Sequence, residues 1–375
     1  MAVEESEFAR GIAAVDRAIA HLEKCTLDKI CRRKHFNDLV SAWWNIGTFS
    51  NRRAHAVKMM HSEGMQRDLA SELERAIRCL KSRKKMCTIR LVLSIFNAYR
   101  YGLKVPDLDY TLVNKKIAQD LNTVSPWVQT ANEPETFIPP SGLDLMIVFT
   151  WAASRVHGVQ LGKGWTLTDM LNVVQARMRP YRIPSISMSK RAYLSTKDTT
   201  VMVLHVIYAI GEFGLSKVSP EGLEDEFEYC AQTLKVAAHF EDYEMVGEIL
   251  DAFDVAGYEE TRGGEKIDVS WARNLLWEKQ NFDGTWGESL DTHRQYVCIL
   301  GMMTRNDRGI LRPLSSLAGQ PMSYELYWET AQAMFSPKTQ ASVTGPSSAV
   351  FSSAILLLVI GWVAFILTNL KRKYT

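Results

Sequence analysis

The feature that most constrains this chain of 375 residues is an uncharged, mostly apolar run of 22 residues near its C-terminus. The run extends from Ala349 to Leu370 and is followed at once by basic residues. A bilayer core of about 30 Å requires about 20 apolar residues in a helix that rises about 1.5 Å per residue. We therefore expect a transmembrane helix at residues 349–370, preceded by a body at 1–335 and a linker at 336–348, and followed by a short basic tail at 371–375.

The position of this run, together with the N-terminal sequence, also predicts the compartment in which the body lies. Because only five residues follow the run, it leaves the ribosome after synthesis ends, as in tail-anchored proteins. The acidic N-terminus MAVEESEFARG lacks the basic and apolar stretches of a signal peptide, so we expect the body in the cytosol. The short basic tail resembles anchors of the mitochondrial outer membrane, which we favour, with the endoplasmic reticulum and the peroxisome as alternatives.

Cysteine usage agrees with a cytosolic body. The six cysteines are scattered over the chain without a tight framework, at positions 25, 31, 79, 87, 230 and 298. Closely spaced, even-numbered cysteines mark the disulfide scaffolds of small secreted domains, and this chain shows no such pattern. We expect the six thiols to be reduced.

Apolar residues in the body recur at helical spacing rather than in alternation. Leu73, Ile77 and Leu80 are an example, and the chain lacks a series of alternating Val/Ile/Thr runs joined by Asn-Gly turns. We therefore predict that the body is all-α.

Six apolar segments of the body each end in a glycine, and these glycines recur at regular intervals. The intervals are 55, 56, 56, 43 and 44 residues, between Gly47, Gly102, Gly158, Gly214, Gly257 and Gly301. Glycine is favoured just past a helix end because it adopts a left-handed conformation without a Cβ clash. A period of this length holds two helices, so we predict about six α/α hairpins, stacked as an open solenoid or closed into a toroid.

The stretch Trp271–Glu288, WARNLLWEKQNFDGTWGE, carries a motif. Its Gln280, Asp283, Gly284 and Trp286 resemble the glutamine-tryptophan motif of terpene cyclases and protein prenyltransferases. The resemblance implies an α/α toroid in which the Gln caps the next helix and the Trp stacks on it, so that consecutive hairpins are joined. It extends loosely over residues 199–305, which we take as the toroid-like part of the body.

The same resemblance suggests a metal site. Protein prenyltransferases hold zinc with an Asp and a Cys two residues apart, and Asp291 and His293 follow the tryptophan turn at that place, with His replacing Cys. Asp and His are zinc ligands. His239, with Asp242 and Glu248 near it in sequence, could complete the site only if the hairpins close face to face. We therefore single out Asp291, His293 and His239 as zinc ligands, with a polar cluster that caps helices as the alternative.

Charge is distributed unevenly along the body. Residues 52–90 contain eleven Lys and Arg against four acidic residues, whereas residues 221–265 contain two against fourteen. Solvated helix faces explain such runs most simply, but a basic patch could also bind phosphates. Its densest part is Lys81, Arg83, Lys84 and Lys85.

These observations lead to three hypotheses for function. We favour a non-catalytic adaptor in which the helical body binds a protein partner at an organelle membrane. The first alternative, from the family resemblance, is an isoprenoid-handling enzyme or a zinc protein that uses Asp291 and His293. The second is a nucleic-acid-binding helical-repeat protein that uses the basic patch, with binding that weakens steeply as salt rises.

Overall fold

The computed structural model describes residues 2–50, 52–80, 86–101, 109–124, 140–156, 158–161, 166–211, 213, 217–218, 221–256, 268–287, 291–303 and 311–312. Helices dominate this part of the chain, as the sequence predicts. They are α1 (Ala2–Leu27), α2 (Lys29–Lys34), α3 (Phe36–Phe49), α4 (Arg53–Met60), α5 (Glu63–Cys79), α6 (Met86–Arg100), α7 (Tyr110–Val124), α8 (Pro140–Ser154), α9 (Leu167–Met178), α10 (Lys190–Ile210), α11 (Glu224–His239), α12 (Tyr243–Ala256), α13 (Ser270–Glu278) and α14 (Thr292–Met302). Two short strands, β1 (Lys217–Val218) and β2 (Leu311–Arg312), pair in parallel.

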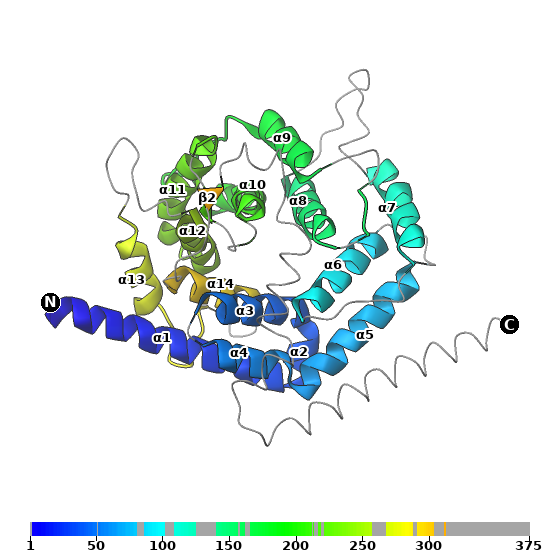
Figure 1. Ribbon diagram of the computed structural model, residues 1–375. Helices are drawn as coiled ribbons and strands as arrows, with labels where there is room; N and C mark the ends of the chain where they lie inside the picture. The colour runs from blue at the N-terminus through cyan, green and yellow to red at the C-terminus, as the bar shows by residue number, and fades with distance from the viewer. Residues whose placement is uncertain are drawn as a thin grey trace.

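One group of helices lies around the middle of the molecule, and the others lie outside it (Figure 1). The inner helices are α3, α6, α8, α10, α12 and α14. Each contacts the next in this order, and α14 also contacts α3, so that the contacts run in a closed circuit. In α8, for example, Phe149, Trp151 and Ala152 are all buried. A helix that is buried on most sides belongs to an inner layer.

The outer helices bury one face only. In α1 the buried residues recur every three or four positions, as Ala14, Ala18 and Leu22 show, whereas Arg17 lies on the exposed face. This is the stripe expected of a helix with one side against a core. Figure 1 shows α1, α5, α7, α9, α11 and α13 outside the inner six.

Helices α12 and α14 cross at a very short distance because both carry glycine at the crossing. A Cβ added to Gly301 would lie 2.6 Å from the Gly247 carbonyl oxygen, and one added to Gly247 would lie 2.8 Å from the Cys298 backbone. Gly301 therefore lies inside α14 and permits close packing, whereas the sequence pattern predicted a glycine just past a helix end.

The other glycines of the predicted repeat behave differently from one another. Gly158 lies four residues after the last residue of α8 and has a φ of 82°, a conformation that favours glycine. Gly47 lies inside α3, so the prediction for it is wrong. The remaining three, Gly102, Gly214 and Gly257, lie outside the described residues.

The turn between α13 and α14 is built by the residues of the predicted motif. Asp283 accepts hydrogen bonds from the Thr285 backbone N–H at 3.1 Å and hydroxyl at 2.6 Å. Gly284 has a φ of 88°, and an added Cβ would lie 2.4 Å from the Arg17 carbonyl oxygen of α1. Only glycine fits a position with both properties. Trp286 is fully buried, and its indole N–H donates to the Leu276 carbonyl at 2.7 Å.

Gln280 joins this turn to the start of the chain. Its side-chain N–H donates to the Ala14 carbonyl of α1 at 2.9 Å and to the Gly284 carbonyl at 3.1 Å, while its oxygen accepts from Arg17 at 2.6 Å. The family resemblance implied that Gln280 caps the next helix in sequence. In the structure Asp291 caps α14, and Gln280 links α13 to α1 instead.

Two cysteines differ from the sequence expectation. Cys25 and Cys31 form a disulfide with Cα atoms 5.2 Å apart, so the prediction of a reduced thiol is wrong for this pair. Residues six apart point to different sides of a continuous helix. The chain breaks between α1 and α2 at Asp28, which brings the two sulfurs together. Cys230 and Cys298 are free and buried.

No helix among the described residues is long and apolar enough to cross a bilayer. The predicted anchor at 349–370 lies outside those residues, as do the linker at 336–348 and the tail at 371–375.

The crossing of α12 and α14 leads to a stability prediction. Gly301→Ala should lower the free energy of unfolding by about 1–3 kcal/mol, because the added methyl group overpacks a backbone contact. Urea denaturation of the variant and of Gly142→Ala measures this. Gly142 lies partly exposed in the first turn of α8, where alanine should cost nothing. Equal stability of the two variants would contradict the close packing of α12 against α14 at Gly301.

A second prediction concerns the turn after α13. Trp286→Ala should cost about 3 kcal/mol or more, because it empties a fully buried site and removes the bond to Leu276. Trp271, which lies in α13 just before this turn and is 39% exposed, is the matched control for Trp→Ala. A loss below about 1 kcal/mol for Trp286→Ala in thermal or urea denaturation would refute this placement.

Candidate functional site

Charged side chains from three inner helices converge at one place. They are Asp38 of α3, Glu244 and Glu248 of α12, and His293 of α14, and we call them the central polar cluster. Helical spacing explains the acidic part, since Glu244 and Glu248 are four residues apart and lie on one face of α12. His293 is the second residue of α14, where the chain enters the inner layer.

His293 lies between two carboxylates. Its Nε2 is 2.9 Å from Glu248 Oε1, and its Nδ1 is 3.4 Å from Asp38 Oδ1. Burial alone would lower the pKa of the imidazole, but the hydrogen bonds to Asp38 and Glu248 raise the pKa well above its ordinary value. The two carboxylates thus favour the protonated imidazole, which is the cation of the cluster. Its side chain is 40% exposed, so the cluster is open to solvent and solutes.

Lys197 of α10 neutralises the other end of the cluster. Its Nζ lies 2.9 Å from Asp242 Oδ2 and 3.7 Å from Glu244 Oε2. Burial raises the pKa of the Glu244 carboxyl, Lys197 opposes this, and Glu248 adds to it. Glu244 and Glu248 therefore repel each other, which favours any cation that binds between them.

A second ion pair lies beside the cluster. His205 of α10 contacts Asp144 of α8 through its Nδ1. Burial lowers the pKa of His205, but the charge of Asp144 and the hydrogen bond to it outweigh burial, so the pKa is raised. The charges of Glu248 and His293 act on the same imidazole, which places this pair within electrostatic reach of the cluster.

Glu244, Glu248 and His293 have the geometry of metal ligands. One potential ligand atom from each lies within 4.8 Å of the other two, and among the described residues this is the group in which three such side chains converge. Carboxylate oxygen and imidazole nitrogen bind zinc and related divalent ions.

The residues singled out from sequence are placed differently from one another. His293 is in the converging group, whereas Asp291 and His239 are not. Asp291 is the N-cap of α14, accepting from the Arg294 backbone N–H at 3.2 Å and pairing with its guanidinium at 3.1 Å. His239 ends α11 and stacks edge-to-face on Phe240. The basic residues Lys81, Arg83, Lys84 and Lys85 lie outside the described residues.

Two members of the cluster were not found from sequence. Glu244 precedes Glu248 by one helical turn, and this i, i+4 pair of carboxylates on one helix was the available signal. Asp38 lies 255 residues before His293, and no local pattern indicates that α3 and α14 are neighbours.

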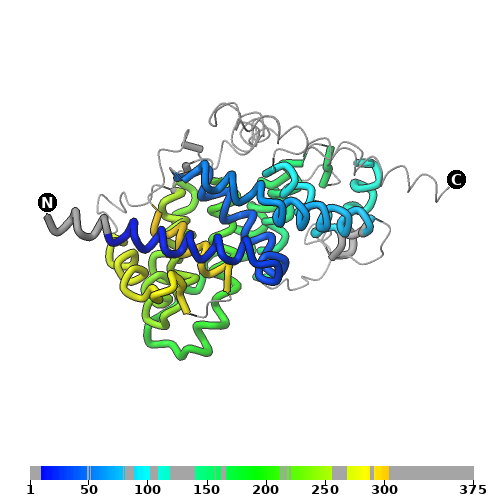
Figure 2. The backbone as a smooth tube through the Cα atoms, turned by 90° about the horizontal axis from the view of Figure 1, so that it is seen from below, coloured from blue at the N-terminus to red at the C-terminus, as the bar shows by residue number. Residues whose placement is uncertain are grey.

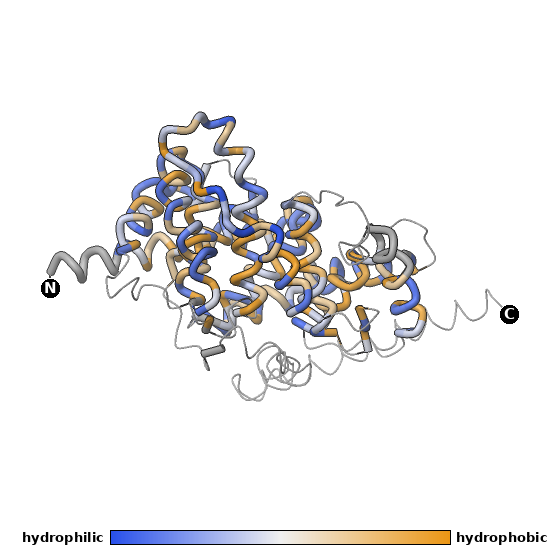
Figure 3. The backbone as a smooth tube through the Cα atoms, turned by 90° about the horizontal axis from the view of Figure 1, so that it is seen from above, coloured by the Kyte–Doolittle hydropathy of each residue, from blue (hydrophilic) through white to orange (hydrophobic). Residues whose placement is uncertain are grey.

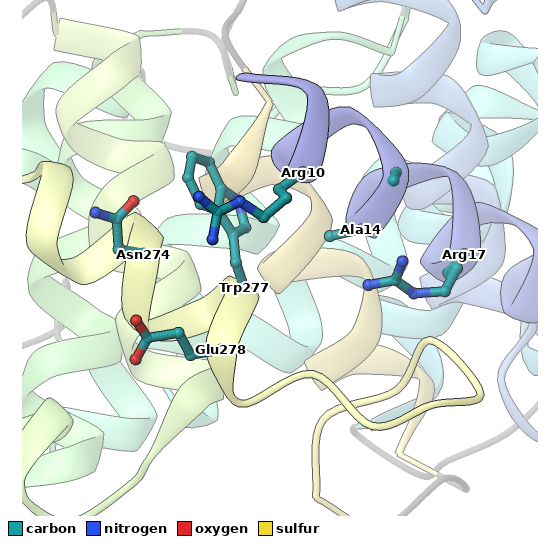
Figure 4. Close-up of a pocket in the computed structure, with 7 residues that line it drawn as sticks. Arg10, Ala14, Arg17, Asn274, Trp277 and Glu278 are labelled. Carbon is teal, nitrogen blue, oxygen red and sulfur yellow. The ribbon is translucent and has the colours of Figure 1, made fainter. Parts of the chain in front are cut away.

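A separate cavity lies between α1 and α13 (Figure 4). Its volume is about 260 Å³, and its lining includes Arg10 and Arg17 from α1 and Trp277 and Glu278 from α13. The indole N–H of Trp277 is buried without a hydrogen-bond partner among the described residues. A buried donor of this kind is costly, so a bound acceptor group would be favoured there.

The pair of His205 and Asp144 predicts a pH dependence of stability. Because the pKa of His205 is raised on folding, the stabilisation is fully present below the unfolded pKa of about 6.5 and is lost as pH rises through the folded pKa. Asp144→Asn should therefore cost about 1–2 kcal/mol near pH 6 and progressively less at higher pH. Urea denaturation across this range measures the difference, and a cost that does not change with pH would contradict the ion pair.

No protein-family model, no curated protein and no solved structure matches this chain. The resemblance to terpene cyclases and protein prenyltransferases therefore depends on the Gln280–Trp286 turn, and function must be argued from the site itself.

Proposed function

We propose that this protein binds a divalent metal ion at the centre of a helical ring that is held on a membrane. The observation that carries the metal site is the convergence of Glu244, Glu248 and His293 from two inner helices. This revises the ligand set suggested by the family resemblance, because only His293 is retained from it.

The ligand atoms fit a metal after a small adjustment. Two atoms that each lie about 2.1 Å from one ion can be at most about 4.2 Å apart. The atoms here lie within 4.8 Å of one another, so side-chain rotations that move each by less than about 1 Å suffice. The bound ion would take the place of the proton on His293 Nε2 as the positive charge between the carboxylates.

The surroundings of His293 also suit a metal ligand. Histidine ligands commonly donate their second ring N–H to a carboxylate, which fixes the tautomer and the ring orientation. Asp38 lies beside Nδ1 at 3.4 Å and can accept this bond. In addition, the Tyr208 hydroxyl donates to the Glu248 carbonyl at 2.8 Å and holds this turn of α12 in place.

Two carboxylates and one imidazole favour zinc or a similar first-row ion over magnesium or calcium, which prefer oxygen ligands alone. Three protein ligands leave at least one position for water or a substrate, as in catalytic zinc sites. When bound there, such an ion would act as a Lewis acid or lower the pKa of its water.

We further propose that the body is an α/α toroid of six hairpins. Its inner layer consists of α3, α6, α8, α10, α12 and α14. The closed circuit of contacts among these helices supports this, and so does the bond from Gln280 to α1, which links the last hairpin to the first.

The membrane part of the proposal depends on the sequence of residues 349–370. Their length and lack of charge suit one membrane-spanning helix. The body then faces the cytosol from an organelle membrane, with the mitochondrial outer membrane as the first candidate.

An adaptor function is the second candidate, and the cavity between α1 and α13 favours it. The guanidinium groups of Arg10 and Arg17 line the cavity and could bind acceptor groups of a partner protein. Metal binding and partner binding use different parts of the molecule, so the two functions are compatible. Nucleic-acid binding through the basic patch stays a prediction from sequence.

The metal proposal is tested by the metal content of the full-length protein, purified in mild detergent without chelators. We expect about one equivalent of zinc or a related ion, because three ligands converge at one place. The ion should be lost in Glu248→Gln and in His293→Ala. Asp38→Asn should keep the site but weaken zinc binding by about 10- to 100-fold, since it removes the partner of the His293 ring.

Asp291→Asn is the matched control, since asparagine is an equally good helix cap. It should retain the metal if Asp291 is only the N-cap of α14. Circular dichroism checks that each variant is folded. A folded wild-type protein that neither contains nor binds Zn²⁺ or Mn²⁺ would overturn the proposal, and loss of metal in Asp291→Asn would support the ligand set suggested by the family resemblance instead.

A further inference from the structure

The connection between α9 and α10 projects from the body and carries exposed apolar side chains. Figure 2 shows this connection as a green loop that extends beyond the neighbouring helices, and Figure 3 shows hydrophobic and hydrophilic residues mixed along it. Ile183 and Ile186 of this loop are 48% and 61% exposed, and Leu194 in the second turn of α10 is 53% exposed. Single exposed apolar residues are ordinary, but here two in the loop and one at the start of α10 occur within twelve residues, which is a reason to look for a partner.

Hydrogen bonds to a buried carboxylate fix the base of this loop on the body. Glu226 of α11 is fully buried and accepts hydrogen bonds from Gln175 at 3.3 Å, Arg179 at 3.0 Å and the Tyr181 hydroxyl at 2.8 Å. Pro184 is also buried. The buried contacts at Arg179, Tyr181 and Pro184 fix the backbone, so the intervening Arg182 and Ile183 face solvent.

The exposed positions next to the apolar ones are basic. Arg182, Lys190 and Arg191 are exposed and form no ion pair with a described residue. The sequence contains no Asp or Glu from Met170 to Lys197. Asp225, at the base of the loop, lies 3.6 Å from Arg179, which also pairs with the buried Glu226.

We propose that this surface docks the body on an anionic lipid membrane. The surface consists of Arg182, Ile183, Ile186, Lys190, Arg191 and Leu194, and we call it the α9–α10 surface. Apolar side chains that enter the interface, flanked by Lys and Arg that meet lipid phosphates, are the combination by which proteins bind a bilayer surface. This inference rests on the membrane attachment proposed above.

The anchor also explains why so small a surface is sufficient. Three basic residues and three apolar side chains would hold a free protein on a membrane only weakly. A body that is already tethered by residues 349–370 meets the bilayer at a high effective concentration, so a weak contact is populated. The contact would then set the orientation of the body relative to the membrane.

Hydrogen–deuterium exchange of the full-length chain in vesicles tests this inference. We compare vesicles of phosphatidylcholine with vesicles that also contain phosphatidylserine. The amides of residues 182–194 should exchange about threefold or more slowly on the anionic vesicles, since each basic residue adds attraction. The effect should fade between about 0.1 M and 1 M salt, where the Debye length falls from about 10 Å to about 3 Å.

A charge-reversal variant and a matched control identify the residues. Replacing Arg182, Lys190 and Arg191 together by Glu should abolish the protection. Replacing the exposed Lys29, Lys58 and Lys115 by Glu changes the net charge equally and should leave the protection unchanged. Equal exchange on both kinds of vesicle, or equal protection in both triple variants, would overturn the inference, and in the first case an acidic protein becomes the better candidate partner.

Carbonate extraction of the same vesicles separates failure of the anchor from failure of the surface. A chain that resists extraction but shows no protection at 182–194 has the anchor and lacks the proposed contact. A chain that is extracted lacks the anchor. In that case, salt-sensitive binding of the chain to anionic vesicles that is lost in the Arg182, Lys190 and Arg191 variant would support the surface alone, and no such binding would overturn it.

Discussion

The packing of α14 against α12 and against the N-terminal helices α1 and α3 is the contact on which the rest of the structure depends. On one side α14 lies against α12 at a crossing so close that Gly247 and Gly301 leave no room for a Cβ. On the other side it contacts α1 and α3 from the first fifty residues. The turn before it adds the bond from Gln280 to Ala14 and the buried Trp286. Without α14, neither the circuit of inner helices nor the surroundings of His293 would exist.

The packing of the helices also determines how the buried acidic side chains are neutralised. The acidic stretch at 221–265 looks like a solvated surface in sequence, but it is divided in the structure. Glu226 is buried beneath the loop between α9 and α10, while Glu248 faces His293. Carboxylates this well buried need cationic partners or hydrogen-bond donors, and Arg179, His293 and Lys197 supply them. Where a proton on His293 can provide that charge, a metal ion can as well.

Sequence patterns predicted features that depend on neighbouring residues. They did not predict features that depend on contacts between residues far apart in the chain. The helical class and the turn at Asp283, Gly284 and Trp286 could be read from sequence, because each depends on spacing along the chain. The family resemblance pointed to His293, which the structure places beside Glu244 and Glu248. The partner of Gln280 could not, since Ala14 is 266 residues away. Asp38 was missed for the same reason. Gly301 was predicted to follow a helix end, but it lies at the contact of α14 with α12. A sequence does not show whether a glycine ends its own helix or lets a second helix pack closely against it. The disulfide was missed because its geometry depends on a break at Asp28 that apolar periodicity does not show.

The link between Asp38 and His293 has a consequence for the order in which the protein assembles. During synthesis α1 and α3 emerge first, and their surfaces for α13 and α14 stay uncovered until almost the whole body has left the ribosome. Contacts of such high sequence separation form late and slowly, and apolar surface that waits for a partner is prone to aggregate. The early helices of a nascent chain would therefore be the segments most in need of a chaperone. Their completion by α14 would come shortly before the apolar segment at 349–370 is itself released.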